Sequence, residues 1–400
     1  MKKTIKKIFT LENRLLLILM LVAMAVGIWG NYRQLWLESN GFEVETISDL
    51  MSIGMLASCV IALLITFIST KVKIKEIMVL ALSNNVISMI GLTYLNGTND
   101  FFLIKMLTLI TIVTESIFWI GIYPLITGVK KDKRIYSRKT ILQNSSKDVG
   151  ILIMGLMIGK TIFNKVVDYN FALYLPITLI IIAVFLLGSI NYETEKDNDI
   201  KSRSFSKSIR YLLRNKINIL FLLYVLLANA SYDVLIGLQM LIFINLFKFT
   251  NTTASIFILV CGSISTFVAI YVVRHIKIKT NFTANLLKYV PRIVFYILAI
   301  ITNKIEIAIV AIFITLITSR MASEYTDGAY VNLVDNDVQF MYSNIRYFII
   351  ELGEALGFYL AGITYNLGLK YMFLTAVIIL IPQLIVSYII SNMYEKIKQN

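Results

Sequence analysis

The sequence predicts an all-α integral membrane protein with twelve transmembrane helices in two parallel, pseudo-symmetric bundles of six. First, 58% of its 400 residues are apolar, only 16% are charged and only 4 are proline, unlike a soluble domain. Second, apolar windows of about 20 residues, enough to cross roughly 30 Å of hydrocarbon, recur along the chain. Third, residues of the first half recur about 200 positions later, as expected for a duplicated bundle.

Apolar windows of spanning length predict the individual helices, because a helix satisfies its own backbone hydrogen bonds and an isolated strand in lipid cannot. Reading along the chain, we expect helices at about 14–37, 47–70, 76–95, 101–125, 141–163, 171–190, 217–247, 253–273, 284–302, 305–326, 343–366 and 370–390.

Lysine and arginine positions predict the orientation. With a cytoplasmic amino terminus, one membrane face holds all 38 basic residues except Arg33, Lys105, Lys160, Lys165, Lys248, Lys304 and Lys370. This asymmetry follows the positive-inside rule, and an even number of helices returns the carboxyl terminus to the cytoplasm. We therefore expect a multi-pass protein of the cell (plasma) membrane. Its abundance of isoleucine, lysine and asparagine suggests a bacterial source.

Several function classes are disfavoured by what the sequence lacks. The net charge of +14 is spread over short loops without a nucleic-acid-binding motif, so we expect no nucleic-acid partner. The single histidine, His275, and two mid-helix cysteines, Cys59 and Cys261, give no metal cluster and no disulfide framework. No phosphate-binding loop or nucleophile triad is present. We expect no cofactor, no metal and no enzymatic activity.

The internal repeat divides the chain. The matched residues, at offsets of 200 to 204, are Arg14 with Arg214, Cys59 with Cys261, "VKIK" (72–75) with "IKIK" (276–279), and Asp148, Gly150 and Gly159 with Glu351, Gly353 and Gly362. We predict an amino-terminal bundle at 1–190, a basic cytoplasmic linker at 191–216 and a carboxyl-terminal bundle at 217–400.

Twelve spans, two parallel halves and a long basic central loop resemble the major facilitator superfamily over the whole chain. "STKVKIKEIM" (69–78) keeps the basic character of the family's loop signature after the second helix but lacks its glycine and its aspartate–arginine pair. In that family, helices 1, 4, 7 and 10 line a substrate cavity, and the two halves rock around it. The resemblance therefore implies a secondary transporter that works by alternating access.

Isolated charges in the helices predict gates. Arg33 follows Arg14 by about 28 Å of helix, at about 1.5 Å per residue, and the same distance from Arg214 leads to Asp233. Both would then lie at the outer ends of their helices, and we predict that Arg33 and Asp233 form an outer gate pair. The alternative is that Arg33 reaches the lipid headgroups and Asp233 is solvated.

The cytoplasmic side offers a complementary pair. Glu115 and Arg320 both fall in the inner halves of their predicted helices, so they could close that side. Arg320 could instead pair with Glu324, four residues later on the same helix. Glu115 should face the cavity in either case, because a carboxylate exposed to lipid is costly.

Buried carboxylates are the candidates for carrying a coupling proton. Asp233 and Glu115 are the first choices. Asp148, Glu351 and Glu354 are secondary candidates, which could instead be structural ties to Lys147 or Arg346.

Aromatic side chains beside these charges suggest the substrate. Trp29, Trp119 and Tyr232 lie close to Arg33, Glu115 and Asp233 in the sequence, and aromatic walls favour amphipathic or weakly cationic molecules. We therefore expect a monomer in the lipid bilayer that exports a small amphipathic molecule or drug in exchange for protons. The alternatives are a nutrient-uptake symporter, a flippase or multidrug-and-toxin-extrusion-type exporter, a membrane-embedded enzyme and a non-transporting sensor.

Overall fold

A computed structural model describes residues 11–68, 73–95, 100–129, 133–162, 165–190, 210, 213–275, 281–320 and 339–399. A helix occupies every one of the twelve predicted windows, so the predicted all-α fold class is confirmed. Its helices are α2 (Leu11–Ser39), α3 (Val44–Ile68), α4 (Ile74–Thr93), α5 (Phe101–Val129), α6 (Lys133–Met157), α7 (Phe171–Gly188), α9 (Lys216–Ile236), α10 (Gln239–Leu241), α11 (Asn251–His275), α12 (Asn281–Thr302), α13 (Ile305–Thr318), α15 (Gln339–Leu367) and α16 (Leu369–Gln399).

Ten helices in the described parts of the chain are long and apolar enough to cross a membrane. Since an apolar helix of this length matches the hydrocarbon thickness of a bilayer, the chain is a multi-pass membrane protein. The predicted cytoplasmic placement of both termini stays a prediction.

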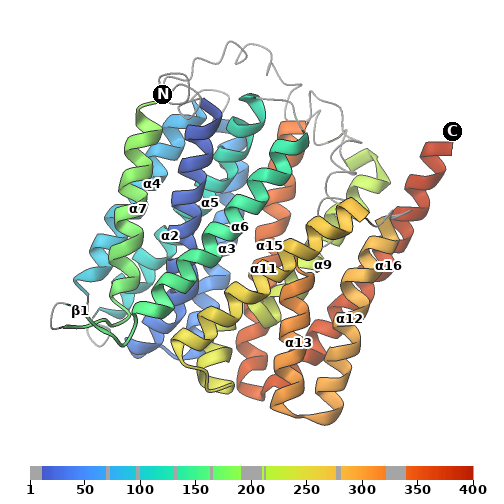
Figure 1. Ribbon diagram of the computed structural model, residues 1–400. Helices are drawn as coiled ribbons and strands as arrows, with labels where there is room; N and C mark the ends of the chain where they lie inside the picture. Colours follow the sequence, from blue (N-terminus) through green and yellow to red (C-terminus); the bar gives the residue numbers. More distant parts are fainter. Residues whose placement is uncertain are drawn as a thin grey trace. The chain divides into compact units, whose positions relative to one another are not determined.

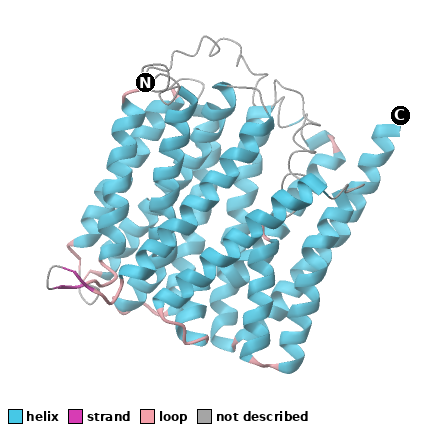
Figure 2. Ribbon diagram, in the orientation of Figure 1, coloured by secondary structure: helices cyan, strands magenta, loops and turns pink. Residues whose placement is uncertain are grey.

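The largest difference from the predicted windows is at α6. This helix begins at Lys133, inside a basic segment that hydropathy excludes, and it ends at Met157. Gly159 has a φ of 79°, a backbone conformation that glycine adopts readily. The short strands β1 (Thr161–Ile162) and β2 (Lys165–Val166) then pair in antiparallel fashion, and β1 lies inside the window that predicts helix (Figure 2).

A second difference interrupts the predicted helix at 217–247. Helix α9 ends at Ile236, and the amide of Gly237 donates a hydrogen bond to the carbonyl of Asp233 at 3.0 Å. After a turn, the chain continues as α10 and then as the π-helix η1 (Ile242–Leu246). Hydropathy did not indicate this break, because apolar residues continue through it.

The described contacts separate the chain into two units. Unit 1 comprises residues 1–43, 64–193 and 239–262, and unit 2 comprises 44–63, 194–238 and 263–400. The units are not the contiguous halves expected from the repeat, and the predicted division at 1–190 and 217–400 stays a prediction. Of the predicted linker 191–216, only residues 210 and 213–216 belong to the part of the chain that the structure describes.

Corresponding helices of the two units pack against corresponding neighbours within their own unit (Figure 1). In unit 1, α2 packs against α6 and α7, and α4 packs against α5 and α7. In unit 2, α9 packs against α15 and α16, and α12 packs against α13 and α16. This correspondence is what a duplicated six-helix bundle requires.

Glycines at equivalent positions allow the first and fifth helices of each repeat to approach closely. A Cβ at Gly150 would lie 2.5 Å from the carbonyl oxygen of Met24, and a Cβ at Gly353 would lie 2.6 Å from that of Leu226. Both sites therefore require glycine for backbone-to-backbone packing, as is common between membrane helices. The predicted match of Gly150 with Gly353 thus corresponds to the same contact in both units.

Hydrogen bonds from small polar side chains join the second helix of each repeat to the fifth helix of the other repeat. In unit 2, Ser52 Oγ on α3 donates to the carbonyl of Ala355 on α15 at 2.9 Å. In unit 1, Thr252 Oγ1 on α11 donates to the carbonyl of Gly155 on α6 at 2.8 Å. The second helix of one sequence half therefore packs with helices of the other half, which explains why the units are not contiguous.

We expect Gly150→Leu and Gly353→Leu each to lower the thermal unfolding midpoint of the detergent-purified protein, since overpacking typically costs about 1–3 kcal/mol. Gly188→Leu is the matched control, because a Cβ at Gly188 meets no atom within 4 Å. Equal midpoints for all three variants would contradict the repeated glycine contact.

Candidate functional site

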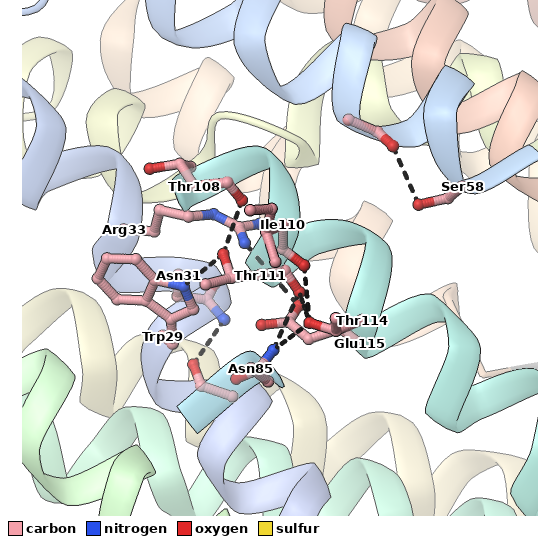
Figure 3. Close-up of polar contacts among 12 residues, drawn as sticks. Trp29, Asn31, Arg33, Ser58, Asn85, Thr108, Ile110, Thr111, Thr114 and Glu115 are labelled. Atoms are coloured by element: carbon pink, nitrogen blue, oxygen red, sulfur yellow. Dashed lines mark hydrogen bonds and ion pairs between the residues drawn. The ribbon is translucent and has the colours of Figure 1, made fainter. Parts of the chain in front are cut away.

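A buried ion pair joins α2 to α5 in unit 1. Arg33 Nη1 lies 3.8 Å from Glu115 Oε2, and the two residues are only 4% and 9% exposed. Figure 3 shows both side chains directed into the space between the two helices. Charges removed from water this completely are rare in a membrane protein and typically mark function.

The pair is incompletely hydrogen-bonded. Within the described structure, the Nε and Nη1 atoms of Arg33 and the Oε1 atom of Glu115 are buried and have no hydrogen-bond partner. A distance of 3.8 Å is too long for a hydrogen bond between the two groups themselves. Most buried polar groups in proteins do have a partner, so these atoms are available to a ligand or to an alternative arrangement.

Trp29 forms one wall beside Arg33. Its indole Nε1 donates to Thr111 Oγ1 at 3.2 Å, which fixes the ring against α5. The guanidinium carbon of Arg33 lies 5.9 Å from the centroid of this ring, within the range of a cation–π interaction. The position of Arg33 therefore depends on Trp29 as well as on Glu115.

A side chain from α4 holds the neighbouring turn of α5. Asn85 Nδ2 donates to the carbonyl of Thr111 at 3.0 Å and to Thr114 Oγ1 at 2.8 Å. Figure 3 shows Asn85 beside these two threonines. Because Glu115 directly follows Thr114, this clamp sets the position of the carboxylate.

Unit 2 contains an equivalent clamp with a different residue. Arg292 on α12 donates from Nη2 to the carbonyl of Thr315 at 3.0 Å and from Nε to Thr318 Oγ1 at 2.8 Å. Thr315 and Thr318 follow Thr111 and Thr114 by 204 positions, the offset of the internal repeat. Arg292 is 2% exposed and has no carboxylate within ion-pair distance among the described residues.

Sequence reasoning missed this second clamp. Arg292 had been counted with a cytoplasmic basic segment, whereas the structure buries it within α12. The signal that could have found the clamp is the pair of sequences "TIVT" (111–114) and "TLIT" (315–318), which place two threonines on one helix face in both halves.

The predicted depths of Arg33 and Glu115 need correction. They were expected in the outer and cytoplasmic halves of the membrane, but the 3.8 Å contact places them at one depth. Both helices extend beyond their windows, to Ser39 in α2 and to Val129 in α5. Arg33 and Glu115 therefore lie farther from the ends of their helices than the predicted windows indicate.

The predicted gate pairs stay predictions. Arg33 and Glu115 belong to unit 1, whereas Asp233 and Arg320 belong to unit 2. Within unit 2, Arg320 Nη1 donates to Thr266 Oγ1 at 2.5 Å. Glu324, the other predicted partner of Arg320, lies outside the described residues.

Asp233 belongs to a group of carboxylates on α9 and α15. Its Cβ would lie 2.7 Å from a Cβ at Gly357, so glycine is required opposite it. Glu351 and Glu354 are close enough to interact electrostatically with Asp233. The structure thus brings one primary and two secondary candidates together, although no metal-binding cluster is found among the described residues.

The secondary candidates also lie beside the two cysteines. Asp148 interacts electrostatically with Cys261 in unit 1, and Glu351 and Glu354 do so with Cys59 in unit 2. These contacts follow the predicted matches of Cys59 with Cys261 and of Asp148 with Glu351.

The other two predicted aromatic residues each lie beside a cation. Lys147 Nζ lies 5.2 Å from the ring centroid of Trp119, and the guanidinium carbon of Arg292 lies 5.9 Å from that of Tyr232. Lys147 also interacts electrostatically with Glu115. The aromatic and charged candidates thus cluster within each unit.

Solved structures share this arrangement of helices. The nucleoside transporter NupG is 14% identical with a TM-score of 0.65, covering 96% of this chain and 99% of its own. The human organic anion transporter MFSD10 is 12% identical with a TM-score of 0.69, covering 94% and 100%. A D-xylose–proton symporter is 10% identical with a TM-score of 0.69, covering 95% and 97%.

No protein-family model matches the chain, and no curated protein matches it. The structural matches extend over nearly the full length of both partners, so the chain has the fold of major facilitator superfamily transporters.

The two clamps allow a matched test of buried hydrogen bonds. Thr318→Val should lower the unfolding midpoint more than Thr114→Val, because it removes the acceptor of a charged donor, worth about 1.5–3 kcal/mol against about 0.5–1.5 for a neutral one. Each threonine also donates a hydrogen bond to a carbonyl one turn earlier. Both variants lose that hydrogen bond, so it does not contribute to the difference between them. The exposed Thr302→Val is the control. A larger effect at Thr114 would contradict the role assigned to Arg292.

Proposed function

We propose that the chain is a secondary active transporter that moves a small molecule across the membrane by alternating access. The observation that carries this proposal is the buried, incompletely hydrogen-bonded Arg33–Glu115 pair, which lies inside a fold shared with known transporters. Alternating access needs groups that can exchange partners between two states, and an ion pair 3.8 Å apart suits that requirement.

We further propose that Glu115 carries the coupling proton. A carboxylate shielded from water can take up a proton when it separates from its cation, and Arg33 is the cation that Glu115 faces on α2. Asp233, beside Glu351 and Glu354, is the corresponding candidate in unit 2. The D-xylose–proton symporter among the structural matches makes proton coupling a reasonable first test.

The direction of transport has two candidates. Aromatic side chains beside isolated charges favour export of an amphipathic molecule or drug. Uptake of a polar nutrient is favoured by a different observation, the free hydrogen-bonding atoms of Arg33 and Glu115. The matched structures are a nucleoside transporter, an organic anion transporter and a sugar symporter, so they do not restrict the substrate to one class.

The experiment that tests the function is flux into sealed proteoliposomes across a panel of compounds, with and without an imposed proton gradient. We expect gradient-dependent accumulation of at least one compound. Ligand binding without flux for any member of the panel would favour the sensor alternative instead.

Glu115→Gln should abolish accumulation driven by a proton gradient while retaining exchange of labelled for unlabelled substrate, since the amide keeps the volume but cannot carry the proton. Glu12→Gln, at the start of α2, is the matched control and should retain both activities. Proton-driven accumulation that survives in Glu115→Gln would assign the coupling role to another carboxylate.

Charge exchange should identify the partner of Arg33 in the transport cycle. Arg33→Asp and Asp233→Arg are each expected to reduce flux strongly, because each reverses a charge and, at the buried Arg33, an unpaired charge costs about 3–5 kcal/mol. If the two residues form the outer gate, the double variant recovers flux. Recovery in Arg33→Glu/Glu115→Arg alone would restrict the pairing to unit 1 and reject the gate.

A further inference from the structure

The geometry of the Arg33–Glu115 pair indicates a loosely held counter-ion. A guanidinium and a carboxylate that are hydrogen-bonded lie about 2.7–2.9 Å apart, whereas these two groups are 3.8 Å apart. Glu115 therefore balances the charge of Arg33 without satisfying any of its N–H groups.

Arg33 keeps unused donors that point to a missing acceptor. Its Nε and Nη1 are buried without a hydrogen-bond partner in the described structure, and the residue is 4% exposed. A guanidinium can only donate hydrogen bonds and stays charged at every physiological pH. The chemistry that would satisfy it is an oxyanion.

We infer that Arg33 is the anchor for an anionic group of the substrate, a carboxylate or a similar oxyanion, and that Glu115 is the resident counter-ion which this group displaces. This inference rests on the proposed transport function and names the class of substrate.

The surroundings allow the exchange without moving the guanidinium. Trp29 lies under Arg33 at 5.9 Å from its ring centroid and is itself held by Thr111, so the aromatic wall stays in place when Glu115 withdraws. Lys147 on α6 is a second cation that interacts electrostatically with Glu115, whereas α4 contributes the uncharged Asn85.

Other ligand charges fit this site less well. A cation would compete with Arg33 for Glu115 and leave the guanidinium buried without a counter-ion, which is strongly destabilising. A neutral ligand could accept hydrogen bonds from Arg33, but hydrogen bonds to a charged acceptor are roughly twice as strong.

A rescue experiment tests the anchor without knowledge of the natural substrate. Glu115→Ala removes the resident carboxylate, so acetate should take its place and raise the unfolding midpoint of the purified variant. Acetamide, the uncharged analogue, should raise it much less. The double variant Arg33→Gln/Glu115→Ala should not respond to acetate, and Glu12→Ala serves as the control for a lost carboxylate on α2.

We expect apparent acetate affinity at Glu115→Ala to exceed that of the double variant by about 30-fold or more, the effect of removing one partner from a buried charge pair. Where Glu115→Ala does not fold, Glu115→Ser, which also leaves the space of the carboxylate open, replaces it. Equal stabilisation by acetate and acetamide, or an equal acetate response in the double variant, would overturn the inference.

Flux measurements separate this inference from the proposed function. Counterflow in proteoliposomes should favour benzoate over benzamide and benzylamine, which have the same ring and a different charge. Transport of only the neutral or cationic member would reject the anionic substrate and leave the transporter standing. Acetate rescue at Glu115→Ala without flux of any compound would support the anion site at Arg33 and reject the proposed transport function.

Discussion

Close backbone contact between the first and fifth helices of each repeat is the constraint from which the rest of the structure follows. Gly150 against Met24 and Gly353 against Leu226 leave no space for a side chain, so the positions of α2 and α9 are set by their fifth helices. Helix α2 carries both Trp29 and Arg33. The candidate site therefore depends on a contact that is not part of it.

Polar groups inside the two units fall into two kinds. The clamps from Asn85 and Arg292 to paired threonines are hydrogen-bonded and hold neighbouring helices together. The Arg33–Glu115 pair is different, because its two opposite charges face each other at 3.8 Å without a hydrogen bond between them. Hydrogen bonds between neighbouring helices stabilise one arrangement, whereas two charges that are not hydrogen-bonded to each other can change partners. This contrast is the reason to assign function to the pair and structure to the clamps.

Much of the architecture could be predicted from the sequence because lipid restricts the choice. All twelve windows contain helix, and the match of Gly150 with Gly353 corresponds to equivalent backbone contacts in the two units. Local geometry was less accessible. The strand pair β1–β2 and the break after Ile236 lie in or beside apolar stretches, where hydropathy does not distinguish helix from other backbone conformations.

The sequence by itself predicted a helix in each of the twelve windows and their approximate limits, since spanning length and self-satisfied backbone hydrogen bonds leave little alternative in a bilayer. Only the tertiary structure decided which charges meet. Arg33 and Glu115 are 82 positions apart on different helices, and their contact depends on how α2 and α5 pack. Arg292 was hidden for the same reason, because its threonine partners lie on another helix, α13, and only the packing of α12 against α13 brings them together.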